Sequence, residues 1–146
     1  MFVFNLQQVL EHRKNIEEIA LKEFSNALLK LNAERITMMS LIEKGKLLTR
    51  QWKDLVGQPT KIGDLSVYAE YIQCVQQSLR DQVMVVNAAE AETQTRREAL
   101  LSVVKERKIL ETLKEKRRLA YEADCAAQER KELDEVAILK FKRERS

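Results

Sequence analysis

The chain has 146 residues, of which 34% are charged and only 5% aromatic, and its formal net charge is +3. This length corresponds to one domain. With so few aromatic side chains, one proline and three glycines, the composition is typical of long exposed helices or coiled coils rather than a compact globule. The near balance of acidic and basic residues argues against a strongly basic, nucleic-acid-binding composition.

Neither a membrane span nor a leader is predicted. No run of about 18 apolar residues occurs, and the first residues lack the basic region and long apolar stretch of a signal peptide. We therefore expect a cytoplasmic protein. Cys74 and Cys125 would lie roughly 75 Å apart on one straight helix, too far for a disulfide, so we expect two reduced thiols.

In chain order, the first predicted element is a helix over about residues 6–56, with Asn5 as its N-cap. Apart from Gly45, every glycine and the only proline fall within residues 57–63. Gly57 suits the C′ position of the first helix, and Pro59 cannot continue it. The turn is predicted over residues 57–64. Asp64 is then the expected N-cap of a second helix over about residues 65–143.

The first helix carries a heptad seam. Steps of four and three residues reach fifteen positions, eleven of them apolar, as in a coiled coil. These positions are Leu6, Leu10, Arg13, Glu17, Ala20, Phe24, Ala27, Leu31, Glu34, Met38, Leu41, Gly45, Leu48, Trp52 and Leu55.

The second helix has a matching seam that stops before the helix does. It comprises Leu65, Tyr68, Ile72, Val75, Leu79, Gln82, Val86, Ala89, Thr93, Arg96, Leu100, Val103, Arg107 and Leu110. Its continuation would be Lys114, Arg117, Tyr121, Asp124 and Gln128, which is almost wholly polar. A turn near residue 60 makes residue i face about residue 120 minus i, so Leu6 lies opposite about Lys114 and the first helix ends there.

The sequence thus predicts one all-α domain over residues 1–146, an antiparallel two-helix coiled-coil hairpin with an overhanging C-terminal helix. The second helix overhangs by some 40 Å. The overhang is amphipathic, and a lone helix of this kind is marginal in water. We expect it to be ordered by a partner. Its expected docking face carries Leu119, Ala123, Ala126, Leu133, Val136, Ala137 and Phe141.

Catalytic chemistry is not indicated. His12 is the only histidine, so we expect no metal site, and no glycine-rich phosphate loop is present. A rod of two helices has no cleft in which burial could shift the pKa of a carboxylate. We therefore expect no enzyme activity and no cofactor. Residues 105–118 carry seven basic and three acidic side chains, but no parallel zipper follows and no aromatic side chains lie there for stacking, so we expect no nucleic-acid binding.

Three motifs, in order along the whole chain, resemble one known family. They are Phe4-x-Leu6-x-x-Val9-Leu10-x-x-Arg13 at the start, Tyr68-Ala69-Glu70-Tyr71-Ile72-Gln73 after the turn, and Glu129 to Ala137 followed by Phe141 at the end. Together with the length and the unequal helices, they resemble the FliJ proteins of bacterial flagellar export.

The resemblance implies a stalk-like protein of the flagellar type III export apparatus. FliJ-like proteins resemble the central stalk of rotary ATP synthases. They associate with the hexameric export ATPase and its regulator, promote ring assembly and activity, contact the export gate in the inner membrane, and handle empty export chaperones. The resemblance therefore places the protein at the flagellar base, monomeric when free.

The resemblance also implies sites. For ATPase binding it points to the basic tail, Lys140 to Ser146, and to Arg13, Leu133, Asp134, Glu135, Ala137 and Phe141. For export-gate binding it points to Tyr71, Val75 and Ser78, although the family pattern has Leu and Ala at the last two. Two alternatives stay open: a stalk of a virulence type III secretion system, and a self-associating structural coiled coil.

Overall fold

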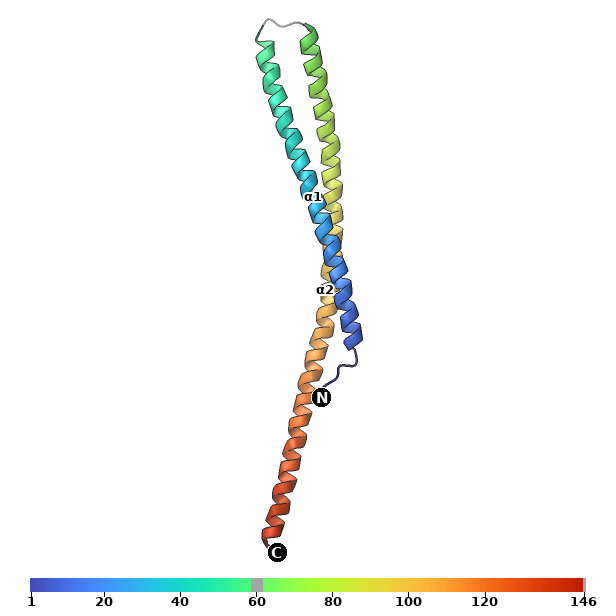
Figure 1. Cartoon of the computed structure of the whole chain (residues 1–146), viewed down its shortest axis with the longest axis vertical. Coiled ribbons are helices and arrows are strands. Elements are labelled where there is room, and N and C mark those ends of the chain that lie inside the picture. Colours follow the sequence, from blue (N-terminus) through green and yellow to red (C-terminus); the bar gives the residue numbers. More distant parts are fainter. Residues whose placement is uncertain (59–61, 146) are drawn as a thin grey trace. The chain divides into compact units, whose positions relative to one another are not determined.

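A computed structural model describes residues 1–58 and 62–145 of the chain. This part consists of two helices, α1 (Gln7–Val56) and α2 (Ile62–Arg145), which pack against each other as an all-α helical hairpin without strands. In Figure 1, α1 runs from blue to cyan and α2 from green to red. The predicted fold class is therefore confirmed. The prediction that Pro59 stops the first helix from continuing concerns a residue outside the described ranges.

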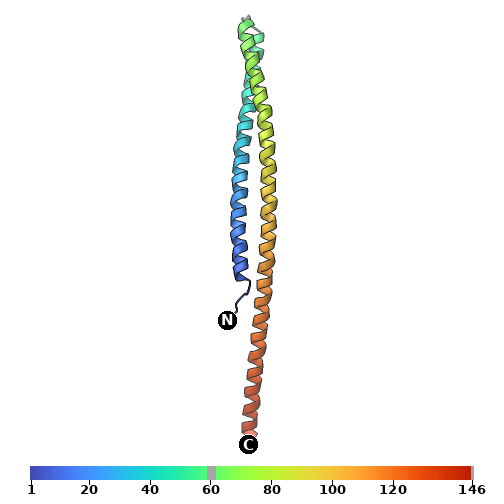
Figure 2. The same ribbon diagram turned by 90° about the vertical axis from the view of Figure 1, so that its right-hand side faces the viewer.

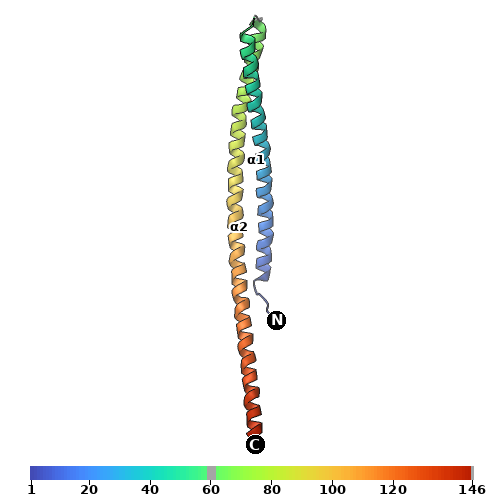
Figure 3. The same ribbon diagram turned by 90° about the vertical axis from the view of Figure 1, so that its left-hand side faces the viewer.

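The chain divides into two compact units, and both helices contribute to each. The hairpin unit is Ile19–Leu101, and the terminal unit is Met1–Glu18 together with Ser102–Ser146. Within the hairpin unit the two helices lie side by side and run in opposite directions, as the views of Figures 1 and 2 agree. Within the terminal unit, α2 continues well past the N-terminus of the chain (Figure 3).

The two predicted seams form the packed face of each helix. Every one of their positions from Leu6 to Leu55 and from Leu65 to Leu110 is buried or half-buried. The hairpin unit has its centre at Leu31, Val86 and Ala89, with Met38 packed against them. In the terminal unit, Leu10 is only 1% exposed. Burial of such side chains is the main force that holds two helices of this kind together.

Polar residues of the seams form hydrogen bonds and ion pairs across the two helices. In the hairpin unit, Gln82 Nε2 donates to Glu34 Oε2 at 2.6 Å, and Arg96 pairs with Glu23 at 3.0 Å. In the terminal unit, Arg107 pairs with Glu17. The two residue numbers of each pair add up to within about five of 120, the sum predicted for residues that face each other. Polar side chains at seam positions specify register because a shifted register would leave them without partners.

The N-caps of the two helices differ from the prediction. The helix α1 begins at Gln7, preceded by a turn in which the Gln7 N–H donates to the Phe4 carbonyl at 3.1 Å, so Asn5 is too far back to be the N-cap. The helix α2 begins at Ile62, which places Asp64 inside its first turn. There its carboxylate faces the positive end of the helix dipole.

Gly57 also differs from its predicted role. None of the described glycines has a positive φ, so Gly57 does not form a left-handed cap. Instead its N–H donates to the Lys53 carbonyl at 3.4 Å, and the Gln58 N–H donates to Leu55 at 3.2 Å. The last turn of α1 thus tightens and satisfies its own carbonyl groups.

Candidate interaction surfaces

The overhang begins where the N-terminal segment stops. Residues 1–6, here called the N-terminal strap, lie against α2: Phe4 is buried, with Arg117 5.6 Å from its ring centroid. Phe2 lies 5.7 Å from Tyr121, measured between ring centroids. Beyond this contact, residues 122–145 of α2 are all exposed. We call residues 122–145 the overhang.

Three of the predicted ATPase-binding residues share one exposed face of the overhang. Leu133, Ala137 and Phe141 follow one another at four-residue intervals, which brings them to the same side of a helix. Leu133 is 68% exposed and Phe141 is 57% exposed. The structure therefore brings these side chains together, over roughly 12 Å of helix. Asp134 and Glu135 are exposed next to this face.

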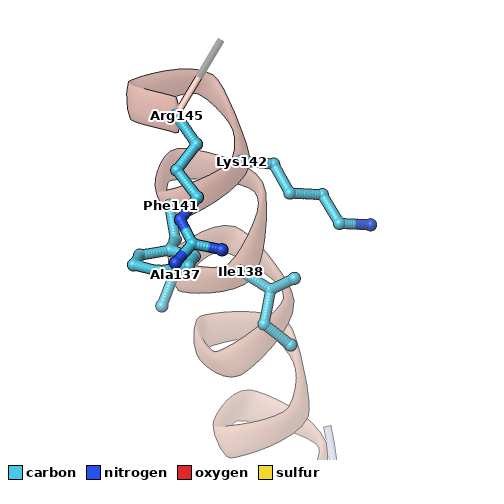
Figure 4. Close-up of a pocket in the computed structure, with 5 residues that line it drawn as sticks. All are labelled: Ala137, Ile138, Phe141, Lys142 and Arg145. Atoms are coloured by element: carbon cyan, nitrogen blue, oxygen red, sulfur yellow. The ribbon is translucent and has the colours of Figure 1, made fainter.

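The end of the overhang combines this apolar face with positive charge. Figure 4 shows the Arg145 side chain folded over Phe141, whereas Lys142 points away from it. The Arg145 guanidinium lies 4.9 Å from the Phe141 ring centroid, a cation–π distance. A shallow hollow here is lined by Ala137, Ile138, Phe141, Lys142 and Arg145. A partner that fits it must offer an apolar group and negative charge.

Apolar side chains extend beyond one face of the overhang. Val136, Ile138 and Leu139 are each more than half exposed, and their positions carry the apolar surface around most of the helix. The overhang as a whole is not apolar, because 13 of its 24 residues are charged, so the large apolar side chains are confined to residues 133–141. A partner that covers residues 133–141 from more than one side would bury all of these apolar side chains.

Arg13 lies apart from these residues. Its guanidinium pairs with Glu106 of α2 within the terminal unit, at a seam position of α1. The ion pair holds the two helices together and leaves the side chain about one-third exposed. The structure therefore does not bring Arg13 to the face formed by Leu133 and Phe141.

The predicted gate-binding residues divide into two kinds. Tyr71 and Ser78 are exposed, whereas Val75 is only 6% exposed and belongs to the seam, opposite Gly45. Lys44 of α1, a residue without a predicted role, places its ammonium group 5.1 Å from the Tyr71 ring centroid. The available surface is therefore Tyr71 with Lys44, and Ser78 about two helical turns further along α2.

The start of the overhang is stiffened by local ion pairs. Arg118 pairs with Glu115 and with Glu122 at 2.5 Å each. The hydrogen bond from Arg118 holds the pKa of Glu115 below its ordinary value, and the carboxylates raise the pKa of Arg118. The neighbouring Cys125 thiol raises the pKa of Tyr121. Pairs at these spacings stabilise helices by a few tenths of a kcal/mol in general, so they support the helix without burying it.

Sequence reasoning overlooked the N-terminal strap as a structural element. The sequence does contain an indication of the strap, because two of the four phenylalanines of the chain are Phe2 and Phe4. Aromatic side chains next to a helix that has lost its coiled-coil partner are suited to cover that helix. The strap extends the packing of α2 to Tyr121, several residues past the end of the predicted seam.

Within the described ranges, no group of three or more His, Cys, Asp and Glu side chains could hold a metal ion. His12 is exposed, and both cysteines are exposed and unbridged. Over the same residues, neither helix contains a segment apolar enough to cross a membrane.

Comparison with known proteins identifies the family. Neither a curated protein nor a solved structure matches the chain. A family model described as "Flagellar FliJ protein" matches residues 1–146, the whole chain. The chain therefore belongs to the flagellar FliJ protein family, a non-catalytic component of flagellar type III protein export.

Proposed function

We propose that this protein is the stalk of the flagellar export ATPase and that it binds the ATPase ring through its overhang. The observation that carries the proposal is that residues 122–145 are helical and exposed throughout, yet carry five large apolar side chains between residues 133 and 141. Such a helix lacks the packing that would make it stable alone. A ring of subunits provides a surface that can cover the apolar side chains of residues 133–141 on several sides of the helix.

Within this proposal the residues have distinct roles. Leu133, Ala137 and Phe141 enter the apolar part of the ring, and Asp134 and Glu135 meet basic side chains of the ATPase. The basic tail meets acidic ones, since opposite charges across an interface favour association and orientation. Arg13 acts indirectly, because its ion pair with Glu106 holds the two helices together in the paired part of the terminal unit.

The contact with the export gate is proposed on the hairpin unit. Tyr71 and Ser78 are exposed there, and Lys44 adds a positive charge beside the Tyr71 ring. Val75 supports this surface from within the seam. The export chaperones and the ATPase regulator are proposed as further partners, and the protein is proposed to lie in the cytoplasm against the inner membrane at the flagellar base.

The first experiment measures ATP hydrolysis by the flagellar export ATPase of the same organism, with and without this chain at equal concentration. The proposal expects a clear rise in rate. It also expects the rise to be lost for a chain that ends after Ala126, which keeps the Phe2–Tyr121 contact and the Arg118–Glu122 pair. A truncated chain that still stimulates hydrolysis would remove the overhang from the proposal.

Point variants sharpen this test in the full chain. Phe141→Ala and Leu133→Ser should reduce both stimulation and co-elution with the ATPase by about ten-fold, because each removes a large apolar contact from the interface. Ile109→Ala is the matched control, since Ile109 is 67% exposed on α2 outside the overhang. It should stimulate hydrolysis like the unaltered chain, and an equal loss for Ile109→Ala would point to a different contact surface.

Two other functions are less well supported. Nucleic-acid binding through residues 105–118 is one of them, because three acidic side chains dilute the seven basic ones and two of the basic ones, Arg107 and Arg118, are paired with glutamates, which weakens attraction to a phosphate backbone. The flagellar description of the family favours the flagellar system over a virulence secretion system.

A further inference from the structure

The outward face of α1 carries an uncharged stripe in the middle of the hairpin unit. Over residues 25–40, all positions opposite the seam are uncharged: Ser25, Asn26, Leu29, Asn32, Ala33, Ile36, Met39 and Ser40. Leu29 and Ile36 are 68% and 69% exposed. In a chain with 34% charged residues, solvent-facing helix positions are where charge normally concentrates. This stripe departs from that rule.

The stripe has the spacing of a second seam. Lys22, Leu29, Ile36 and Glu43 follow at seven-residue intervals, and smaller side chains lie between them. Seven-residue spacing places all four on one line that runs along a supercoiled helix. The first seam, at Leu31 and Met38, faces α2 instead. The helix α1 therefore presents one line of contact to α2 and another to solvent.

The second seam is complementary to itself in the antiparallel direction. A two-fold axis between Asn32 and Ala33 would place Leu29 of one copy against Ile36 of the other, and Lys22 of one against Glu43 of the other. Both contacts occur twice, as two-fold symmetry requires. Among the described residues, no ion pair involves Lys22 or Glu43, so both charges are available to a second copy.

We propose that two copies of this chain associate through the outward faces of α1, antiparallel, with Leu29 and Ile36 at the centre and Lys22–Glu43 pairs at each end. Because Lys22 and Glu43 are complementary to each other across a two-fold axis, the partner that fits this surface is a second copy of this chain. The contact spans about 21 residues, or roughly 30 Å of helix. That is small for a stable protein interface, so the chain is a monomer when dilute and a dimer at high concentration.

The test is sedimentation and light scattering of the full chain over a wide concentration range at low salt. The mass should rise from 17.0 kDa towards twice that value. Lys22→Glu and Glu43→Lys should each weaken the dimer by about ten-fold or more, since each turns two attractive pairs into two repulsive ones. A one-to-one mixture of these two variants should dimerise again, because each heterodimer restores both opposite-charge pairs.

Matched variants separate this surface from others. Met84→Lys alters a side chain that is 71% exposed on α2 and should leave the dimer unchanged, whereas Leu29→Lys should abolish it. Leu133→Ser on the overhang should also leave it unchanged, with circular dichroism confirming helix content throughout. A chain that stays monomeric near millimolar concentration, a mixture that fails to associate, or a dimer lost with Leu133→Ser would each overturn the proposal. None of these variants alters residues proposed to bind the ATPase except Leu133, so the two proposals fail separately.

Discussion

Residues 103–118 and 122–145 belong to the same helix and the same unit, yet they differ in almost every contact. The first segment has seam residues half-buried against α1 and the strap, such as Val103, Arg107 and Leu110. The second segment is exposed throughout and still contains Leu133, Val136, Ile138, Leu139 and Phe141. Apolar content therefore does not distinguish the two segments; the presence of a partner helix does.

This difference separates two reasons for which a helix carries apolar side chains. In the paired segment they stabilise the fold of the chain itself, because their burial removes apolar surface from water. In the overhang they contribute nothing to the isolated fold and remain available to another protein. If the overhang binds the export ATPase as proposed, it is the part of the molecule whose stability depends on that binding.

Amide hydrogen exchange should show the largest effect. In the free protein, the amides of residues 124–144 should exchange roughly 100-fold or more faster than those near Leu31 and Val86, since a helix without tertiary contacts opens locally. Addition of the export ATPase should slow exchange in the overhang. Equal protection of the two segments in the free protein would contradict the comparison.

Shortening a side chain should change the free energy of unfolding much more in the paired segment than in the overhang. Leu10→Ala should lower the free energy of unfolding by about 2–4 kcal/mol, because it leaves a cavity at a side chain that is 1% exposed. Leu133→Ala should change it by less than about 0.5 kcal/mol, as surface substitutions usually do. Urea denaturation followed by circular dichroism measures both, and a comparable loss for Leu133→Ala would show that the overhang is packed.

A substitution in the seam should raise stability. Gly45→Ala should increase the free energy of unfolding by about 1 kcal/mol, since alanine favours the helix over glycine by that amount. A Cβ at this position would lie 3.8 Å from Val75 Cγ1, an ordinary contact. Gly63→Ala, in the first turn of α2, is the comparison and should gain less. A destabilised Gly45→Ala would mean that the helices approach more closely there than the structure shows.

The smallest effect concerns pH at the base of the overhang. Because the hydrogen bond from Arg118 lowers the folded-state pKa of Glu115 below its ordinary value, the pair contributes fully above the unfolded pKa, and its contribution is lost as pH falls through the folded value. Helicity of the overhang should therefore decrease slightly on acidification below about pH 4.5. Glu115→Gln should flatten that part of the pH profile measured by circular dichroism, and an unchanged profile would show that the pair is irrelevant to helix stability.

Much of this arrangement can be predicted from the sequence. The seams from Leu6 to Leu55 and from Leu65 to Leu110 predict the buried faces because helical periodicity maps spacing directly onto a side of the helix. The single cluster of helix breakers predicts where the chain reverses, and the loss of apolar seam residues after Leu110 predicts where pairing ends. The residues of the overhang face follow from the same periodicity.

Other features depend on contacts between segments distant in the sequence. Val75 carries a family-implied binding role, but packing against α1 near Gly45 buries it, and Arg13 is drawn into an ion pair with Glu106. Phe2 and Phe4 meet Tyr121 and Arg117 more than 110 residues away. Periodicity describes one helix at a time, so it identifies which side of a helix is apolar. Only the packing of two helices decides which apolar sides are covered, and which are left for another protein.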